Sequence, residues 1–178
     1  MVGIDGAARA VTQTRNMATV GAVVPAAALV AVPWANGGGV TRVIADRADL
    51  RLSLATIAQA GPFSRFPGVT RHFALVAGQV VFGPHGLVLD AGCDPVVFSG
   101  GDAVDATPLG GPALAFNLMV PDGAPRVRLE RFHGRDMVDA LAIFACEAIT
   151  VDGLTVTAHD TVFPTGPVRL SGPALVVR

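Results

Sequence analysis

The chain has 178 residues and a nearly balanced charge, with 13 Lys and Arg against 14 Asp and Glu. Its basic residues are scattered along the sequence, so no basic patch for nucleic acid or an anionic membrane is predicted, and we expect neither partner. Hydrophobic residues make up 51% of the chain. A chain of this length buries roughly 70% of its unfolded surface, so one domain or two small fused ones can form without disulfides.

The two cysteines predict no covalent framework. Cys93 and Cys146 lie far apart in the sequence and belong to no CxxC motif, so neither a disulfide pattern nor a zinc motif is indicated. We therefore expect both to be buried thiols in a reducing compartment.

The N-terminal residues 1–16 show no periodic apolar pattern and precede a second methionine, Met17, so we interpret them as a loose extension. The next stretch, 17–32, is apolar and follows Arg15, as the core of a signal peptide does. Pro25 and Pro33 interrupt it or end it, and it is too short to span a bilayer. These features favour a cytoplasmic protein.

Short apolar runs then follow in chain order, and most are as long as β-strands. Convincing ten-residue helical patterns are missing, and the 21 glycines and 13 prolines favour strands and turns. An all-β barrel or sandwich is predicted; only residues 139–149, with their alanines, would also suit a helix. The runs are VTRVIA, LRLSLATIA, HFALVA, QVVF, GLVLD, PVVF, ALAFNLMV, VRLERF, LAIFACEAI, LTVTA, DTVF, PVRL and ALVVR.

Two segments of the chain resemble each other. Residues 86–100 read GLVLDAGCDPVVFSG and residues 153–166 read GLTVTAHDTVFPTG. In each, a strand opening on Gly-Leu leads to Asp, then to a strand with valine and phenylalanine, then to a glycine turn. Such a pair is expected of a duplicated half-barrel, although short repeats also arise by chance.

The most distinctive stretch runs from Trp34 to Arg42 and reads WANGGGVTR. Three consecutive glycines permit positive φ angles and a close approach of backbone or ligand. Two interpretations stay open: a turn between strands, or a nest of backbone N–H groups that faces a bound anion.

Together with RLSLA (51–55), GPFSRFPGVTR (61–71), FSGGD (98–102) and AFNLM (115–119), this stretch resembles the HutD/Ves family of bacterial proteins. The resemblance runs from about Pro33 to Met119 and fades in the following VPDGAPRVR. It implies a metal-free bicupin, associated with histidine-utilisation operons, that senses or buffers a pathway intermediate. We accordingly expect an N-terminal cupin half over 17–105 and a C-terminal half over 106–178.

The residues themselves offer little for catalysis or metal binding. Metal-dependent cupins usually carry two histidines at i and i+2 on one strand, whereas this chain has Thr70, Arg71 and His72 at that place. There is no GxSxG motif, and neither Ser53 nor Ser64 has a recognisable base. We therefore expect no metal and no cofactor. The remaining histidines and the candidate acids fall in turns or at strand ends and are read first as structural: His85, His133, His159, Asp90, Asp94 and Asp102.

What is left suits the binding of a small polar anion. In LRLSLA the leucines share one face, so Arg51, Ser53 and Ala55 share the other, which would face the barrel lumen. In AFNLM the same alternation separates Asn117 and Met119 from Phe116 and Leu118. The predicted ligand-binding residues are Arg71, which would hold a carboxylate, with Arg65 and Arg42 as fallbacks, and Asn36, Thr41, Ser53, Ser64, Asn117, Trp34, Phe63, Phe66 and His72.

Three functions follow as hypotheses. The first, implied by the family resemblance, is a bicupin that binds a small anionic metabolite such as N-formylglutamate or urocanate. The second is a metal-independent cupin isomerase or hydrolase that uses His72 with Arg71, His72 acting as a general base. The third is a structural or interaction protein whose barrel mouth is closed. The sequence leaves the oligomeric state open, a homodimer included.

Overall fold

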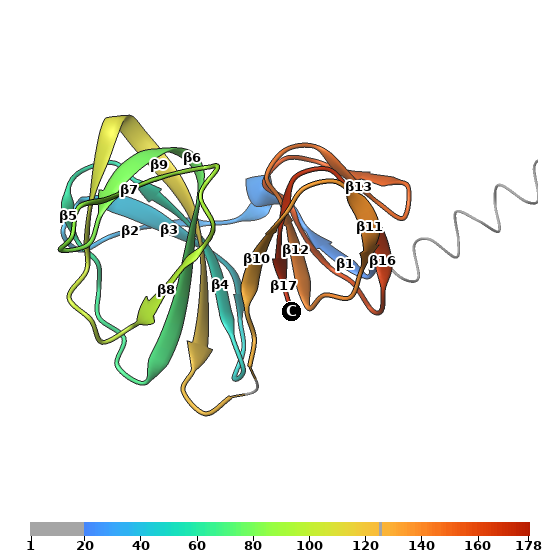
Figure 1. Ribbon diagram of the computed structural model, residues 1–178, viewed down its shortest axis with the longest axis horizontal. Coiled ribbons are helices and arrows are strands. Elements are labelled where there is room, and N and C mark those ends of the chain that lie inside the picture. Colours follow the sequence, from blue (N-terminus) through green and yellow to red (C-terminus); the bar gives the residue numbers. More distant parts are fainter. Residues whose placement is uncertain (1–19, 125) are drawn as a thin grey trace, which may run out of the picture. The chain divides into compact units, whose positions relative to one another are not determined.

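The computed structural model describes residues 20–124 and 126–178, and they form an all-β protein (Figure 1). The predicted loose extension 1–16 lies outside the described residues. Apart from one short 3-10 helix, η1 (Ala26–Ala28), the regular elements of the described part are strands. They are β1 (Ala22–Val24), β2 (Ala31–Pro33), β3 (Gly39–Asp46), β4 (Arg51–Ile57), β5 (Gly61–Pro62), β6 (Val69–Phe82), β7 (Leu87–Asp90), β8 (Val96–Ser99), β9 (Asp105–Pro121), β10 (Leu129–Phe132), β11 (Arg135–Val138), β12 (Ala142–Ala145), β13 (Ile149–Val151), β14 (Leu154–Val156), β15 (Thr161–Phe163), β16 (Val168–Ser171) and β17 (Ala174–Val177).

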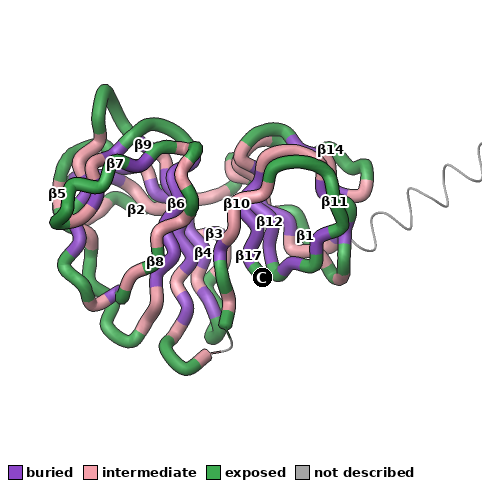
Figure 2. Tube along the Cα trace, in the orientation of Figure 1, coloured by how far each residue is buried: buried purple, intermediate pink, exposed green. Residues whose placement is uncertain are grey.

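The first of two compact units spans Leu29–Leu129. Its strands form one sheet in the order β2-β3-β4-β9-β6-β7, with β5 paired to β9 and β8 paired to β6. Its core is built from side chains that alternate along these strands, among them Phe73, Leu75 and Val80, which are almost fully buried. The buried stretches of β4 and β6 are visible in Figure 2.

The long strands β6 and β9 each pair with different strands along their two halves, because the pairing between them is irregular near the middle. The β6–β9 register shifts between Leu75 and Ala77 and again between Ala77 and Gln79. Gly78, at φ +78°, lies at this point, and a Cβ there would come within 2.9 Å of the Ala113 Cα. As a result, residues 70–73 of β6 pair with β8, whereas residues 79–82 pair with β7.

The second unit combines residues 20–28 with Glu130–Arg178. It has a five-stranded sheet, β1-β15-β12-β17-β10, and a four-stranded sheet, β11-β16-β13-β14. Its buried cluster consists mainly of valines, isoleucines and alanines, including Ile143 and Val162 at 0% exposure. The early residues are fixed here by pairing of β1 with β15 and by the Ala26 amide, which donates to Asp160 Oδ1 at 2.8 Å.

The two units share one pairing order. In the first, the two halves of β6 pair with β8 and β7; in the second, β12 pairs with β15 and β13 pairs with β14. Strands β12 and β13 thus correspond to the two halves of β6. Strand β9 pairs with both halves of β6, and in the second unit β17 pairs with β12 while β16 pairs with β13. The two similar segments found in the sequence become β7–β8 and β14–β15, one pair in each unit. Both segments therefore hold equivalent positions in the pairing order.

The units divide the chain differently from the expected halves 17–105 and 106–178. A boundary after residue 105 would cut β9, which pairs with β4 and β6 along its length. The first unit instead continues to Leu129. Residues 20–28, expected in the N-terminal half, belong to the other unit because β1 pairs with β15.

Three smaller expectations also have outcomes. The segment 139–149 contains the strands β12 and the start of β13, and no helix. Cys93 and Cys146 are not joined in a disulfide, and both are only partly buried, whereas buried thiols were expected. Among residues 20–124 and 126–178, no helix is long and apolar enough to cross a membrane.

Candidate functional site

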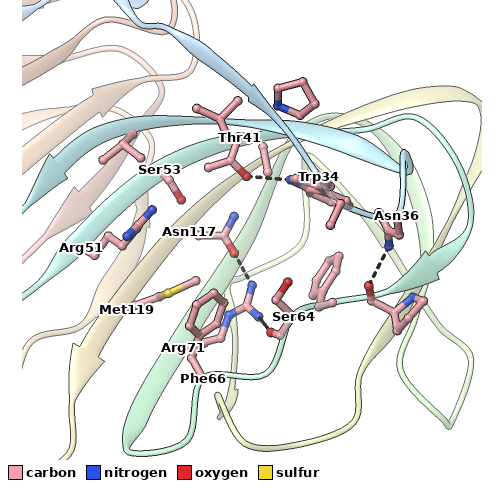
Figure 3. A pocket seen from close by; sticks show the side chains of 17 residues that line it. Trp34, Asn36, Thr41, Arg51, Ser53, Ser64, Phe66, Arg71, Asn117 and Met119 are labelled. Atoms are coloured by element: carbon pink, nitrogen blue, oxygen red, sulfur yellow. Dashed lines mark hydrogen bonds between the residues drawn. The ribbon is translucent and has the colours of Figure 1, made fainter.

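A cavity of about 460 Å³ opens in the first unit, over one face of its sheet (Figure 3). Its walls come from strands β2, β3, β4, β5, β6 and β9, the turn that follows β2 and the loop that follows β5. The lining residues are Val32, Pro33, Trp34, Ala35, Asn36, Thr41, Val43, Arg51, Ser53, Ala55, Pro62, Phe63, Ser64, Phe66, Arg71, Asn117 and Met119.

The strand register arranges the polar lining residues in rows across the sheet. Arg51 of β4 and Arg71 of β6 both pair with Met119 of the intervening β9, so the three form one row. Ser53 and Asn117 form the next row. The face that carries them is the one predicted from the alternation in LRLSLA and AFNLM. The cavity therefore has its cations in one row and neutral hydrogen-bonding groups in the next.

Arg71 is held in place by two hydrogen bonds and three aromatic rings. Its Nη2 donates to Asn117 Oδ1 at 3.0 Å, and its Nη1 donates to the Ser64 carbonyl oxygen at 3.4 Å. Its Cζ lies 5.1 Å from the ring centres of both Phe63 and Phe98, close enough for cation–π attraction. A third ring, Phe66, is 5.8 Å away. The guanidinium is thus fixed before any ligand arrives.

The charge of Arg71 has no counter-ion in the part of the chain that the structure describes. The residue is 5% exposed, and its Nε has no hydrogen-bond partner. Burial lowers the pKa of Arg71 to about 10, because removal from water disfavours the charged form. The side chain still carries its positive charge at neutral pH. A buried cation left unpaired is costly, and such groups normally find an anion.

Aromatic side chains make the apolar wall. Phe63 lies at their centre, with its ring centre 5.5 Å from that of Phe73 and 6.1 Å from that of Trp34. Trp34 in turn donates its indole N–H to Thr41 Oγ1 at 2.8 Å. The Thr41 hydroxyl accepts in this bond, so its own hydrogen is free to point elsewhere. The wall leaves a few polar groups in an otherwise apolar space, which is typical of small-molecule sites.

The triple glycine forms a turn between β2 and β3, the first of the two interpretations. The Gly37 amide donates to the Trp34 carbonyl oxygen at 3.0 Å, and the Gly38 amide donates to Asn36 Oδ1 at 3.0 Å. These N–H groups are therefore engaged within the turn and do not form a nest for an anion. Gly39 is required by close packing, since a Cβ there would overlap the Thr56 carbonyl oxygen.

Nine of the ten predicted ligand-binding residues line this cavity, and His72 is the exception. His72 follows Arg71 on a regular part of β6, so its side chain points to the other face of the sheet. It is 7% exposed, its Nδ1 has no partner among the described residues, and burial lowers its pKa. His72 therefore does not line the cavity with Arg71, although the sequence analysis grouped the two.

Two of the nine residues use their polar groups differently from the prediction. Asn36 is engaged by the turn, with its Nδ2 also 3.5 Å from the Pro62 carbonyl oxygen. Ser64 contacts Arg71 through its backbone carbonyl, and the side chain itself is not used in that bond. In these bonds, Asn36 and Ser64 hold neighbouring parts of the cavity wall in place. Ser53, Asn117 and Thr41 are the neutral groups that face the cavity from the sheet.

Sequence reasoning left Arg51 and Met119 out of the predicted site, although both line the cavity. The sequence did contain a signal for them. The alternation that put Ser53 and Asn117 on the cavity face also puts Arg51 and Met119 there, because each lies two positions away on the same strand. Of the fallback cations, Arg42 donates to Thr56 Oγ1 at 3.3 Å, and Arg65 borders a smaller cavity of about 140 Å³. Neither lines the large one.

No group of three or more His, Cys, Asp or Glu side chains is arranged to hold a metal ion within 20–124 and 126–178. The donors around the cavity are the guanidinium groups of Arg71 and Arg51, amides and hydroxyls. These groups bind anions and polar uncharged groups.

The fold and the cavity thus define an all-β protein of two units, one of which has an arginine-lined pocket. A family model described as HutD matches residues 26–168, which is further along the chain than the sequence motifs alone indicated. The chain belongs to the HutD family.

Relatives support this assignment. The chain is 35% identical over 114 residues to an uncharacterised 21.2 kDa protein in the hutC 3′ region of Pseudomonas putida; the match covers 58% of this chain and 60% of that protein. The structure of HutD from Pseudomonas fluorescens SBW25, in a formate condition, is 25% identical with a TM-score of 0.75, over 88% of this chain and 96% of that one. A conserved protein of unknown function from Pseudomonas aeruginosa PAO1 is 28% identical with a TM-score of 0.71, over 88% and 95%.

Proposed function

We propose that the protein binds a small carboxylate metabolite in the cavity, with the carboxylate paired to Arg71. The observation that carries this proposal is a buried, aromatic-flanked guanidinium that faces a 460 Å³ cavity with no counter-ion among the described residues. A carboxylate would supply the missing negative charge and would accept hydrogen bonds from the planar guanidinium.

The hydrogen-bond inventory supports this role. A guanidinium has five N–H groups, and Asn117 and Ser64 account for two of those in Arg71. The others have no partner among the described residues. Ser53 and Asn117, in the neighbouring row, would bind the polar groups of the ligand that carry no charge, and Thr41 would supply a further hydroxyl. The apolar ring of Phe63 would contact its carbon atoms.

Family membership suggests which metabolite. We propose an intermediate of histidine degradation, N-formylglutamate or urocanate, and a cytoplasmic protein that modulates histidine utilisation. The position of the Pseudomonas putida relative beside hutC supports this direction. We further propose that the two units are the fused cupin halves of a bicupin, an idea supported by their common pairing order.

The other two hypotheses have less support. The isomerase or hydrolase would need His72 near the ligand, whereas His72 does not line the cavity. A closed structural barrel would leave no room for a ligand, whereas the cavity is as large as ordinary small-molecule sites.

Titration calorimetry of N-formyl-L-glutamate and urocanate against the wild type and Arg71→Met tests the proposal. Hydrogen bonds to a charged group support a loss of affinity of roughly 10-fold to 150-fold in the variant. Methionine fills much of the arginine volume, so the aromatic wall should stay in place.

Two control variants accompany this titration. Arg47→Met removes an exposed arginine of the same unit, one paired with Asp49 and absent from the cavity wall. His72→Gln changes the neighbour of Arg71 that points to the opposite face. Both should bind like the wild type. Equal affinities of wild type and Arg71→Met, or no binding of either compound by the wild type, would refute the proposed role.

A further inference from the structure

Arg51 forms a second cationic position in the same cavity. It lines the cavity from β4, and its Nη1 donates to Asp46 Oδ2 at 2.9 Å. Asp46 itself does not line the cavity. The Arg51 side chain therefore borders the cavity, whereas Asp46, to which it is paired, lies outside the cavity wall.

The register sets the spacing between the two arginines. Arg51 and Arg71 both pair with Met119, so they lie in one row with a single strand between them. Two strand spacings place their Cα atoms roughly 10 Å apart. Both side chains border one cavity, and the apolar Met119 lies between them. Two positive ends separated by an apolar side chain match a short carbon chain with a carboxylate at each end.

The present partner of Arg51 can be displaced easily. The Arg51 and Asp46 side chains are 40% and 60% exposed, and ion pairs at such exposure contribute little to stability. On release, the Asp46 carboxylate would return to water, so no buried charge would be left unpaired. Arg71 differs because it is buried and has no anionic partner among the described residues.

We propose that the ligand is a dicarboxylate, whose first carboxylate pairs with Arg71 while the second displaces Asp46 from Arg51. This inference rests on the proposed function, because it places a second charge on the ligand of that same site. It selects a dicarboxylate such as N-formylglutamate over a monocarboxylate such as urocanate. Asp46 then acts as a resident competitor that lowers affinity for the second carboxylate.

Titration calorimetry with a matched pair of ligands tests this. N-formyl-L-glutamate and N-formyl-L-glutamine differ only in the second carboxylate, which the latter replaces with an amide. The wild type should prefer the dicarboxylate by about 5-fold, the upper range for an ion pair at a half-exposed position. Arg51→Gln should abolish this preference.

Two further variants sharpen the test. Asp46→Asn should strengthen binding of the dicarboxylate alone, because the competing carboxylate is gone. Arg47→Gln, which alters a similarly exposed arginine paired with Asp49, should keep the wild-type preference. Equal binding of both ligands by the wild type, or an unchanged preference in Arg51→Gln, would overturn the inference and leave carboxylate binding at Arg71 standing. Failure of the wild type to bind any of the compounds, urocanate included, would overturn both.

Discussion

The buried position of Arg71 is unfavourable for stability, because its charge has no counter-ion among the described residues. The three surrounding rings and two hydrogen bonds offset only part of this cost. Replacing buried ionic groups by apolar side chains of similar volume is often neutral or stabilising. We therefore expect Arg71→Met to unfold at the same temperature as the wild type or higher in the absence of ligand. A fall of more than about 5 °C, observed by calorimetry, would show that Arg71 mainly stabilises the fold.

His72 should make stability depend on pH. Burial lowers its pKa in the folded protein, so between that value and its usual 6.5 the unfolded chain binds a proton that the folded chain does not. The stability that comes from keeping His72 neutral is fully present above pH 6.5, and it is lost as pH falls through the pKa of His72 in the folded protein. The free energy of unfolding should therefore decrease below pH 6.5, with a slope of at most about 1.4 kcal/mol per pH unit from this proton.

Urea unfolding between pH 5 and pH 7.5 measures this slope. His72→Gln should flatten the profile, whereas His133→Gln, at an exposed histidine, should not. An identical profile in wild type and His72→Gln would contradict the assignment. Because His72 faces away from the cavity, its replacement should leave ligand affinity unchanged.

The turn of the Trp34–Arg42 stretch sets one edge of the cavity. Gly37 lies in the left-handed region at φ +71° but has open space around it, whereas Gly39 packs on the Thr56 carbonyl and the Trp34 ring. Gly39→Ala should lower the free energy of unfolding by about 3 kcal/mol through overpacking. Gly37→Ala should cost only about 1 to 2 kcal/mol, from backbone strain. Equal effects of the two substitutions in urea unfolding would contradict this account of the turn.

The individual strands, and the faces that their residues share, could largely be predicted from the sequence. The alternation in LRLSLA and AFNLM correctly put Ser53 and Asn117 on one face because side-chain direction in a strand is a local property. His72 shows the limit of that success, since it was grouped with Arg71 by motif although adjacent residues point to opposite faces. The same alternation also put Arg51 on the face of Ser53, but Arg51 was left out of the predicted site; the pairing of both Arg51 and Arg71 with Met119 shows that the two arginines lie in one row.

At the scale of the whole molecule, the all-β class and the repeated strand pairs were predictable, but the division of the chain was not. Composition and turn residues determine the class, whereas unit boundaries depend on long-range pairing. The pairing of β1 with β15 joins residues more than a hundred positions apart, and no local pattern indicates it. The continuous β9 likewise crosses the boundary expected after residue 105.

The assignment of residues 20–28 to the C-terminal unit has a direct test. Val20 is 1% exposed and belongs to the buried cluster of that unit, whereas Val30 is 78% exposed. Val20→Ala should lower the free energy of unfolding by about 1 to 3 kcal/mol, and Val30→Ala should change it by less than about 0.5 kcal/mol. Urea unfolding measures both values. Equal effects would show that the early residues do not stabilise the unit.

The central claim, that a carboxylate pairs with Arg71 inside the cavity, is tested most directly by a crystal structure of the protein grown with N-formyl-L-glutamate. The account predicts a carboxylate oxygen about 2.7 to 2.9 Å from an Nη atom of Arg71, with the carbon chain along Met119 and the second carboxylate toward Arg51. A ligand bound elsewhere, or a cavity that holds only water at saturating ligand, would contradict it.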